Sequence, residues 1–273
     1  MLDDVAVREA FHVVLLRELV RRVNPSLFRL KGGVNLRLFF GSVRYSEDID
    51  LDGDDRARPA LRREVGRLLQ DPALLRQLAA RGIRGIEART GPNKDTETTL
   101  RYKMRVVSPG GVPLPGKVEV SFRKLGSPED AAMDDADEKI VSQYLGSGDL
   151  PLRVAHYTLM PAVKQKIAAL GLRTEVQARD VFDLARLARN SVDTLDLAFL
   201  RRSLNDDTLG EARNRALTLS FEQYRDTVVE FLDPAERLSL ATERAWDEQR
   251  LFAVELMEAI VAQSSPNEGE IPK

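Results

Sequence analysis

The segment Ser46–Asp52, SEDIDLD, constrains the fold of this chain more than any other. Side chains alternate between the two faces of a β-strand, so a strand here places Asp48 and Asp50 on one face. Ile49 and Leu51 then point into the core. Two carboxylates about 4 Å apart repel by about 4 kcal/mol at an effective dielectric constant of about 20. Because Mg²⁺ bound with substrate phosphates commonly neutralises such pairs, the segment predicts a metal site.

Two glycines precede this strand, in the segment KGGVNLRLFF. Gly32 and Gly33 would let the backbone approach a phosphate at the start of a helix, although a Gly-Gly pair alone is also typical of a plain turn. Arg37 and Arg44 follow, and each is predicted either to contact phosphate or to pair with Glu47 or Asp52. The glycines and the carboxylates together predict metal-dependent nucleotidyl transfer.

A third carboxylate is predicted on the segment KVEVSFR, which alternates between apolar and polar residues. Enzymes of the polymerase-β type place two carboxylates on one strand and a third on its neighbour, where they hold metal ions. Glu119 would complete a set with Asp48 and Asp50 that binds Mg²⁺ or Mn²⁺. It would also lower the proton affinity of the attacking hydroxyl or take its proton. The alternative for Glu119 is a solvated strand residue.

Composition excludes several other classes of site. The 273 residues include no cysteine and only two histidines, so thiolate metal sites and disulfides are excluded and a histidine-based zinc site is not expected. His12 is predicted to pack within a helix and His156 to lie in a loop. The N-terminus lacks the basic start of a signal peptide, and no apolar run approaches the ~18 residues that span a membrane. We therefore expect a cytoplasmic protein.

Hydrophobic periodicity predicts an α/β N-terminal half and a helical C-terminal half, with a boundary near residue 135. In the first half, helices are predicted over Asp3–Arg22, Val34–Phe40, Arg58–Leu69 and Pro72–Arg81, and strands over Leu27–Leu30, Asp48–Asp52, Ile83–Arg89, Thr98–Val107 and Lys117–Arg123. In the second half, the main predicted helices are Pro161–Leu170, Val176–Arg189, Leu195–Leu204, Phe221–Leu232 and Trp246–Ala262. Trp246 and the Phe221–Tyr224 pair are expected in the core of the helical half.

Two segments of the chain resemble a known family. KGGVNLRLFFGSVRYSEDIDL resembles the AbiEii/AbiGii toxin family, polymerase-β-like nucleotidyltransferases that include the mycobacterial MenT toxins. KQKIAALGLRTEVQARDVFDL resembles its second signature, a Lys-x-x-Ala-Leu helix followed by Arg-Asp-x-x-Asp-Leu; the matching residues are Lys166, Arg173, Arg179, Asp180 and Asp183. The two signatures bracket residues 27 to 187 in the expected order.

The resemblance implies an α+β fold. A polymerase-β-like nucleotidyltransferase domain with a mixed sheet flanked by helices would span residues 1–135. An α-helical domain over residues 136–262 would complete the active site. The polar residues 263–273 are predicted to be a disordered tail.

The resemblance also implies an NTP-dependent toxin of a toxin–antitoxin or phage-defence system, with a cognate antitoxin as partner. Such an enzyme would transfer nucleotides to RNA, with the 3′ acceptor end of tRNA as the expected target, and so block translation. The implied functional set is Ser46, Asp48, Lys166 and Asp180, with Lys166 gripping the triphosphate. Lys164 is the rival for that role, and Asp183 is expected to orient Lys166.

Two further functions stay open at this point. The same carboxylates would serve nucleotidyl or phosphoryl transfer to a protein or a small molecule, and a degenerate site would leave a non-catalytic nucleotide-binding scaffold. Two arginine-rich sets either bind an RNA backbone or form solvated helix faces balanced by acids. They are Arg56, Arg58, Arg62, Arg63 and Arg67 in one run, and Arg173, Arg179, Arg186, Arg189, Arg201 and Arg202 in the second half.

Overall fold

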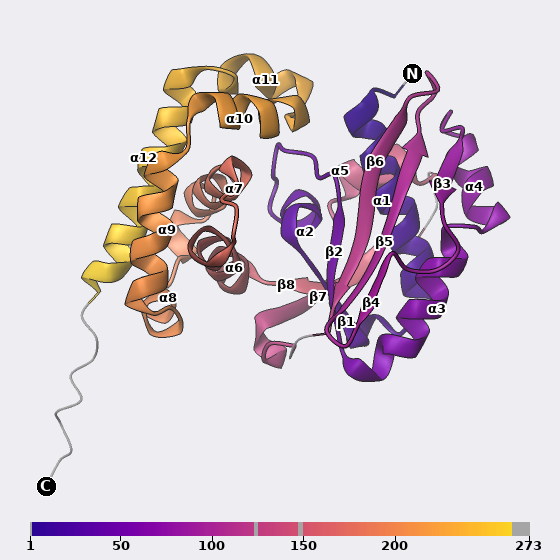
Figure 1. Cartoon of the computed structure of the whole chain (residues 1–273), viewed down its shortest axis with the longest axis horizontal. Helices are drawn as coiled ribbons and strands as arrows, with labels where there is room; N and C mark the ends of the chain where they lie inside the picture. Colours follow the sequence, from indigo (N-terminus) through magenta and orange to yellow (C-terminus); the bar gives the residue numbers. More distant parts are fainter. Residues whose placement is uncertain (1, 123–124, 147–149, 264–273) are drawn as a thin grey trace, which may run out of the picture. The chain divides into compact units, whose positions relative to one another are not determined.

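The chain folds into two compact units, Met1–Thr158 and Leu159–Lys273 (Figure 1). The structure is a computed structural model that describes residues 2–122, 125–146 and 150–263. The predicted disordered tail therefore lies almost wholly outside the described residues. The first unit is a mixed sheet with helices, and the second is helical, in agreement with the predicted fold class.

The first unit is built on an eight-stranded mixed sheet within the described residues. Along the sheet the strand order is β3-β5-β6-β2-β1-β8-β7, and β4 pairs with β5. β2 runs parallel to β6, and β1 runs parallel to β8; the other neighbours are antiparallel. The strands are β1 Phe28–Lys31, β2 Ile49–Gly53, β3 Gly85–Ala88, β4 Lys94–Thr96, β5 Thr99–Val107, β6 Pro113–Ser121, β7 Ala131–Asp135 and β8 Arg153–Tyr157.

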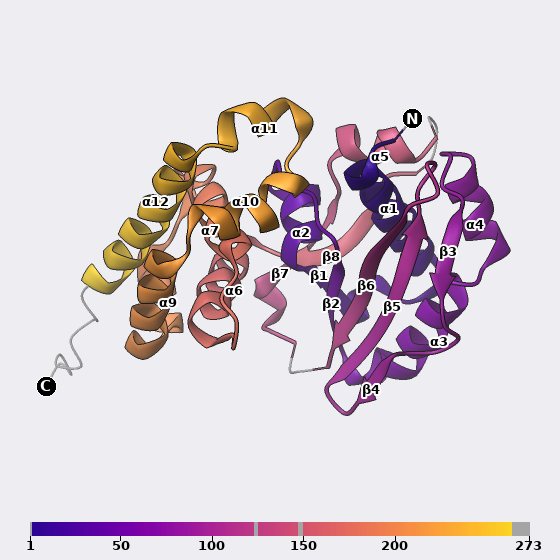
Figure 2. The same ribbon diagram turned by 45° about the horizontal axis from the view of Figure 1, so that its top comes forward.

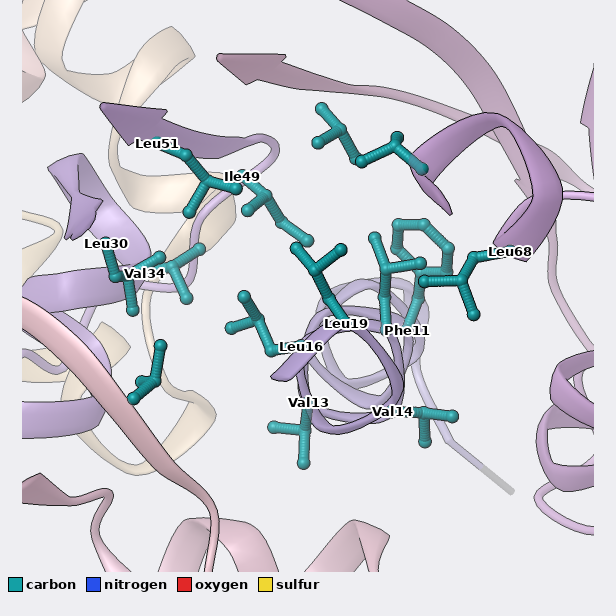
Figure 3. Packing of buried hydrophobic residues seen from close by; sticks show 14 of the residues in the cluster. Phe11, Val13, Val14, Leu16, Leu19, Leu30, Val34, Ile49, Leu51 and Leu68 are labelled. Carbon is teal, nitrogen blue, oxygen red and sulfur yellow. The ribbon is translucent and has the colours of Figure 1, made fainter. Parts of the chain in front are cut away.

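One face of this sheet is covered by helices. The helix α1 lies behind β5 and β6 in both views, with α3 and α4 on the same side (Figures 1 and 2). Figure 3 shows Leu16 and Leu19 of α1 lying beside Ile49 of β2 in the hydrophobic core. The helices of this unit are α1 Asp4–Arg22, α2 Gly32–Phe39, α3 Arg58–Leu68, α4 Pro72–Ala79 and α5 Glu138–Tyr144.

The boundary between the units lies later than the sequence suggested, after Thr158 rather than near residue 135. β8 pairs with β1 through Leu30 and His156, and β7 pairs with β8, so this stretch belongs to the first unit. The expected loop position of His156 is wrong, because His156 lies buried on β8. Its ring stacks on Phe39 with centroids 3.6 Å apart and contacts the Asn35 side chain.

The strand β6 begins at Pro113, within a stretch that the sequence predicted as a connection. Its prolines pair with β5, in the register Val107↔Pro113 and Arg105↔Pro115. β2 joins β6 only from Val118 onward, so Pro113 and Pro115 lie on an edge where no donor N–H is needed. The predicted end of this strand, Arg123, lies outside the described residues.

The second unit is a packed group of helices. α6 packs against α7 and α9, and α12 packs against the same two helices. Trp246 and Tyr224 stack at the centre, with ring centroids 4.7 Å apart, which confirms their predicted core positions. The helices are α6 Leu159–Leu172, α7 Ala178–Arg189, α8 Leu197–Ser203, α9 Asp206–Thr218, α10 Phe221–Thr227, α11 Pro234–Leu240 and α12 Glu243–Ala262.

Candidate active site

The predicted alternation of the acidic strand is confirmed. Ile49 and Leu51 of β2 are fully buried, while Asp50 points to the opposite face of the sheet. Asp48 lies just before the strand, two residues from Asp50. On β6, Val118 and Val120 are fully buried, which places Glu119 on the same face as Asp50.

A row of four charged residues crosses this face. Asp50 is the direct register partner of Glu119 on β6 and of Lys31 on β1. Glu119 is in turn the partner of Arg101 on β5. Because partners on neighbouring strands lie side by side, the sequence of charges across the sheet is Lys31, Asp50, Glu119, Arg101. The two central carboxylates are thus flanked by cations on both sides.

Each neighbouring carboxylate has a cationic partner. Asp48 accepts from the backbone N–H of Lys117, and its other oxygen lies 3.0 Å from the Lys117 Nζ. Glu119 accepts from the Arg101 Nε at 2.5 Å. Asp52 accepts from Lys31 Nζ at 2.5 Å and from the Tyr157 hydroxyl at 2.7 Å. The site is therefore acidic at its centre and basic at its rim.

The protonation of Asp50 is perturbed by its surroundings. Burial raises the pKa of Asp50 above its ordinary value of 3.8, and the nearby carboxylates of Asp48 and Glu119 raise it further. Lys117 and Lys31 oppose this shift. A buried carboxyl group among other carboxylates is the environment that a bound cation would relieve.

The two glycines pack against the carboxylate face. Gly32 has a φ of 70°, and a Cβ there would lie 3.0 Å from Asp50 Oδ2. A Cβ on Gly33 would lie 2.8 Å from Ser46 Oγ. Both glycines open the helix α2, whose first backbone N–H groups have no partner within the helix. This arrangement agrees with the predicted glycine start of a helix beside the acidic strand.

Ser46 and the two arginines that follow the glycines have defined contacts. Ser46 Oγ donates to the backbone carbonyl of Asp48 at 2.9 Å, which fixes the approach to the strand. Arg44 is buried and donates to the Tyr45 carbonyl. Arg37 Nε donates to the buried carboxylate of Glu9 at 2.6 Å. Arg37 thus pairs with an acid on α1 that the sequence did not suggest, and phosphate binding by Arg37 stays a prediction.

Divalent cations fit the chemistry of this face. The side chains of Asp48, Asp50 and Glu119 supply the carboxylate oxygens that Mg²⁺ and Mn²⁺ prefer. In the conformation described, Lys117 and Arg101 hold two of them. No three Asp, Glu or His side chains in the described part of the chain already gather as a ligand group. A bound divalent cation would therefore take over the neutralisation that Lys117 and Arg101 provide.

Two residues beside this face were not predicted. Lys117 pairs with Asp48, and its signal was present, because it stands two residues before Glu119 on the same alternating strand. His12 of α1 is buried as expected, but its ring also hydrogen-bonds the backbone of Glu47. Burial lowers the pKa of His12 to about 4, although Asp48 opposes the shift. His12 is therefore neutral at pH 7.

The second unit contains a separate buried charge cluster. Lys166 of α6 donates to Asp180 at 3.0 Å and to Asp183 at 2.6 Å, both on α7. Arg173 donates to the second oxygen of Asp180 at 2.6 Å. The two aspartates are 1% exposed, so the lysine satisfies carboxylates that lie out of reach of water. The expectation that Asp183 orients Lys166 agrees with these contacts.

The face of the mixed sheet opposite its covering helices thus carries three carboxylates, those of Asp48, Asp50 and Glu119. The family model described as nucleotidyl transferase AbiEii toxin of type IV toxin–antitoxin systems matches residues 14–254. This chain therefore belongs to the AbiEii toxin family. A comparison with curated protein sequences finds no match.

Three solved structures share the fold. MenT4, a nucleotidyltransferase toxin from Mycobacterium tuberculosis, is 18% identical over 96% of this chain and 94% of its own, with a TM-score of 0.57. JHP933 from Helicobacter pylori is 19% identical over 95% of this chain and 93% of its own, with a TM-score of 0.53. A putative nucleotidyltransferase from H. pylori is 20% identical over 95% and 96% of the respective chains, also with a TM-score of 0.53.

Within the described residues, no helix is both long and apolar enough to cross a membrane.

Proposed function

We propose that this toxin transfers nucleotides from an NTP to RNA in a metal-dependent reaction, and that the target is the 3′ acceptor end of tRNA. Modification there would block aminoacylation and so stop translation. One observation supports the proposal above all: Asp50 stands in direct register with Glu119, on the face that Asp48 shares. Membership of the AbiEii family supports nucleotidyl transfer as the reaction.

In this proposal, Asp48, Asp50 and Glu119 hold Mg²⁺ or Mn²⁺, which would neutralise phosphate charge. Gly32 and Gly33 let the start of α2 approach the nucleotide phosphates, because no Cβ blocks the backbone there. Glu119 lies next to Asp50 and is the proposed group that receives or weakens the proton of the attacking hydroxyl.

The roles of the second unit rest on the family signature. We propose that Lys166 binds the triphosphate as well as holding Asp180 and Asp183. Asp180 and Asp183 take two of the three N–H donors of the buried Lys166 ammonium, so phosphate would bind through the third donor or replace one carboxylate. The rival, Lys164, is partly exposed on the same helix and serves as the comparison in mutagenesis.

The acceptor is tested by incubating purified protein and Mg²⁺ with each of the four NTPs in turn, radiolabelled at the α-phosphate. Total tRNA, a bacterial protein extract and buffer alone are the acceptors, and the products are separated on a denaturing gel. We expect label in the tRNA band alone, with a preference among the NTPs. Label confined to protein would contradict the RNA proposal, and no label in any lane from a folded protein would contradict transfer to either RNA or protein.

A further inference from the structure

A basic groove lies on the carboxylate face of the first unit. Its volume is about 610 Å³, and its walls come from β3, β5, β6 and the connection after β3. Three cations line it, Arg89, Lys103 and Arg105, against a single carboxylate, Glu87. We call this feature the β5 groove.

The cations of the β5 groove follow from the strand period. In TLRYKMRVV the basic residues Arg101, Lys103 and Arg105 stand two apart, so all three point to the face opposite the helices. Tyr102 and Met104 between them are buried on the helical side of β5. Successive cations are then about 6.8 Å apart along the strand. A continuous basic row of this kind suits an extended polyanion rather than a single phosphate.

The charge of this groove is not cancelled within the unit. The Arg105 guanidinium lies 3.8 Å from Glu87, and both side chains are more than half exposed. Lys103 and Arg89 are exposed, and in the part of the chain that the structure describes neither has an ion-pair partner. The whole chain has a net charge of −2, so the groove is a local concentration of positive charge on a mildly acidic protein.

The β5 groove continues toward the carboxylates. Gly116 lines it, and a Cβ at this position would lie 3.0 Å from the backbone carbonyl of Glu47, next to Asp48. The following residue, Lys117, pairs with Asp48 and is the register partner of Lys103. An extended polyanion lying in the groove would therefore have one end directed toward Asp48 and the other proposed metal ligands.

The arginine run over residues 56–67, on α3 and the turn before it, differs from the groove in its pairing. Arg56 pairs with Asp54, Arg62 pairs with Asp95, and Arg67 lies 3.5 Å from Glu64. Arg58 shares Asp95 with Arg62, and Arg63 shares Glu64 with Arg67, so three carboxylates pair with the five arginines of the run and offset part of its charge. Each arginine of this run is thus held by an acid, as in the solvated-face alternative, whereas Arg89 and Lys103 of the β5 groove have no ion-pair partner among the described residues.

We infer that the β5 groove binds the sugar–phosphate backbone of the acceptor RNA and guides its 3′ end to Asp48 and Asp50. The inference rests on the proposed function for the identity of the polyanion. Arg89, Lys103 and Arg105 contact phosphates, and Arg101, which pairs with Glu119, lies at the end of the basic row nearer the carboxylates. The contacts are independent of base sequence, because they are charge contacts to the backbone.

The test compares two variants that lose the same charge. The groove variant is Arg89→Ala/Lys103→Ala/Arg105→Ala, and the control variant is Arg56→Ala/Arg62→Ala/Arg67→Ala. Affinity for a short single-stranded RNA with a 5′ fluorescein label is measured by anisotropy at several salt concentrations, without nucleotide. Affinity for a fluorescent NTP analogue is measured separately, and thermal unfolding confirms that both variants fold.

For the groove variant, we expect RNA affinity to fall about tenfold or more and the salt dependence to weaken by about 2 in slope, since each single-strand phosphate contact contributes about 0.7. The control variant should retain wild-type slope, and NTP affinity should be unchanged in both. Equal RNA affinity in all three proteins, or an equal loss in both variants, overturns the inference. Loss of NTP affinity in the groove variant reassigns the groove to the triphosphate and also overturns it.

The proposed function fails in a different way. Wild-type protein that binds RNA through the groove but never labels it with any NTP would contradict nucleotidyl transfer to RNA and leave the groove assignment standing. A groove variant that labels RNA as well as wild type does would support transfer and refute the groove assignment.

Discussion

Gly32 has a left-handed backbone conformation and lies against Asp50 of the candidate active site. Its left-handed φ would cost an alanine about 1–2 kcal/mol, and the added Cβ would lie against Asp50. Gly41 is a matched control, with a φ of 62° and nothing within 4 Å of an added Cβ. We expect both Gly→Ala variants to lose similar unfolding free energy in urea, and only Gly32→Ala to lose transfer activity. Equal activities would contradict the close approach of Gly32 to the site.

The ionised side chain of Asp50 is expected to lower the stability of the fold at neutral pH and to be required for transfer activity. Because burial raises its pKa in the folded state, the folded protein holds this proton more tightly than the unfolded chain. Its contribution to stability is fully present below the unfolded value near 3.8 and is lost as pH rises through the higher folded value. Asp50→Asn should therefore abolish transfer but raise the unfolding midpoint at neutral pH in the absence of metal, by about 2–4 °C for each kcal/mol gained.

A calorimetric scan of wild type and Asp50→Asn across acidic to neutral pH checks this expectation. The gap between their midpoints should widen as pH rises. A variant that is less stable than wild type at neutral pH would show that Lys31 and Lys117 overcompensate the buried charge.

Among single residues, the sequence predicted those whose position follows from the alternation of their own strand. Asp48, Asp50 and Glu119 lie where strand alternation placed them, and Lys117 obeys the same period. His12 could not be associated with the site, because its contact with the Glu47 backbone depends on how α1 packs across the sheet. The partners of Arg37 were equally hidden, since Glu9 lies on a different helix.

At the scale of secondary-structure elements, a buried charge cluster joins the helices α6 and α7. Lys166→Met would leave Asp180 and Asp183 buried with one cation fewer, which typically costs about 3–5 kcal/mol. We expect urea unfolding to show this loss. The triple variant Lys166→Met/Asp180→Asn/Asp183→Asn should recover most of it, because the buried charges are removed together.

The stability measurements are needed to interpret activity, because a Lys166 variant could lose activity either through unfolding or through loss of a phosphate contact. Lys164→Met is the comparison that keeps the cluster intact. A Lys166→Met protein as stable as wild type would contradict the structural part of this account.

Elements with strong periods were predicted and the others were not. The segments of α7 and β5 have clear helical and strand patterns, and both were found. β7 was missed because its sequence, AAMDD, is rich in residues that are depleted in strands. α9 was missed because Gly210 weakens its helical pattern. β8 gains its position from parallel pairing with β1, more than a hundred residues earlier, which no local pattern encodes.

At the scale of the whole molecule, the net charge of −2 gives no indication of the local positive charge in the β5 groove. Average charge argued against a generally basic RNA-binding protein, and the local distribution argues for one basic face. Family membership implies an antitoxin partner, and the described residues do not identify it. Toxicity is tested with the whole chain, expressed in a cell.

We expect expression of this chain alone to slow bacterial growth, because the AbiEii family consists of toxins. Asp48→Ala, expressed to the same level, should grow like the empty vector. The groove variant should give an intermediate rate, since it retains the carboxylates. Normal growth with abundant folded wild-type protein would count against toxicity in that host.

The most direct measurement of the central claim is the rate of label transfer from NTP to tRNA by wild type and Asp48→Asn at increasing Mg²⁺ concentration. Their unfolding midpoints would be matched first. The account predicts Mg²⁺-dependent labelling by wild type and a loss of at least about a hundredfold in Asp48→Asn, the scale on which removal of a preorganised electrostatic group acts. Wild-type rates in the variant, or labelling that does not depend on Mg²⁺, would contradict the assignment of this carboxylate face as the active site.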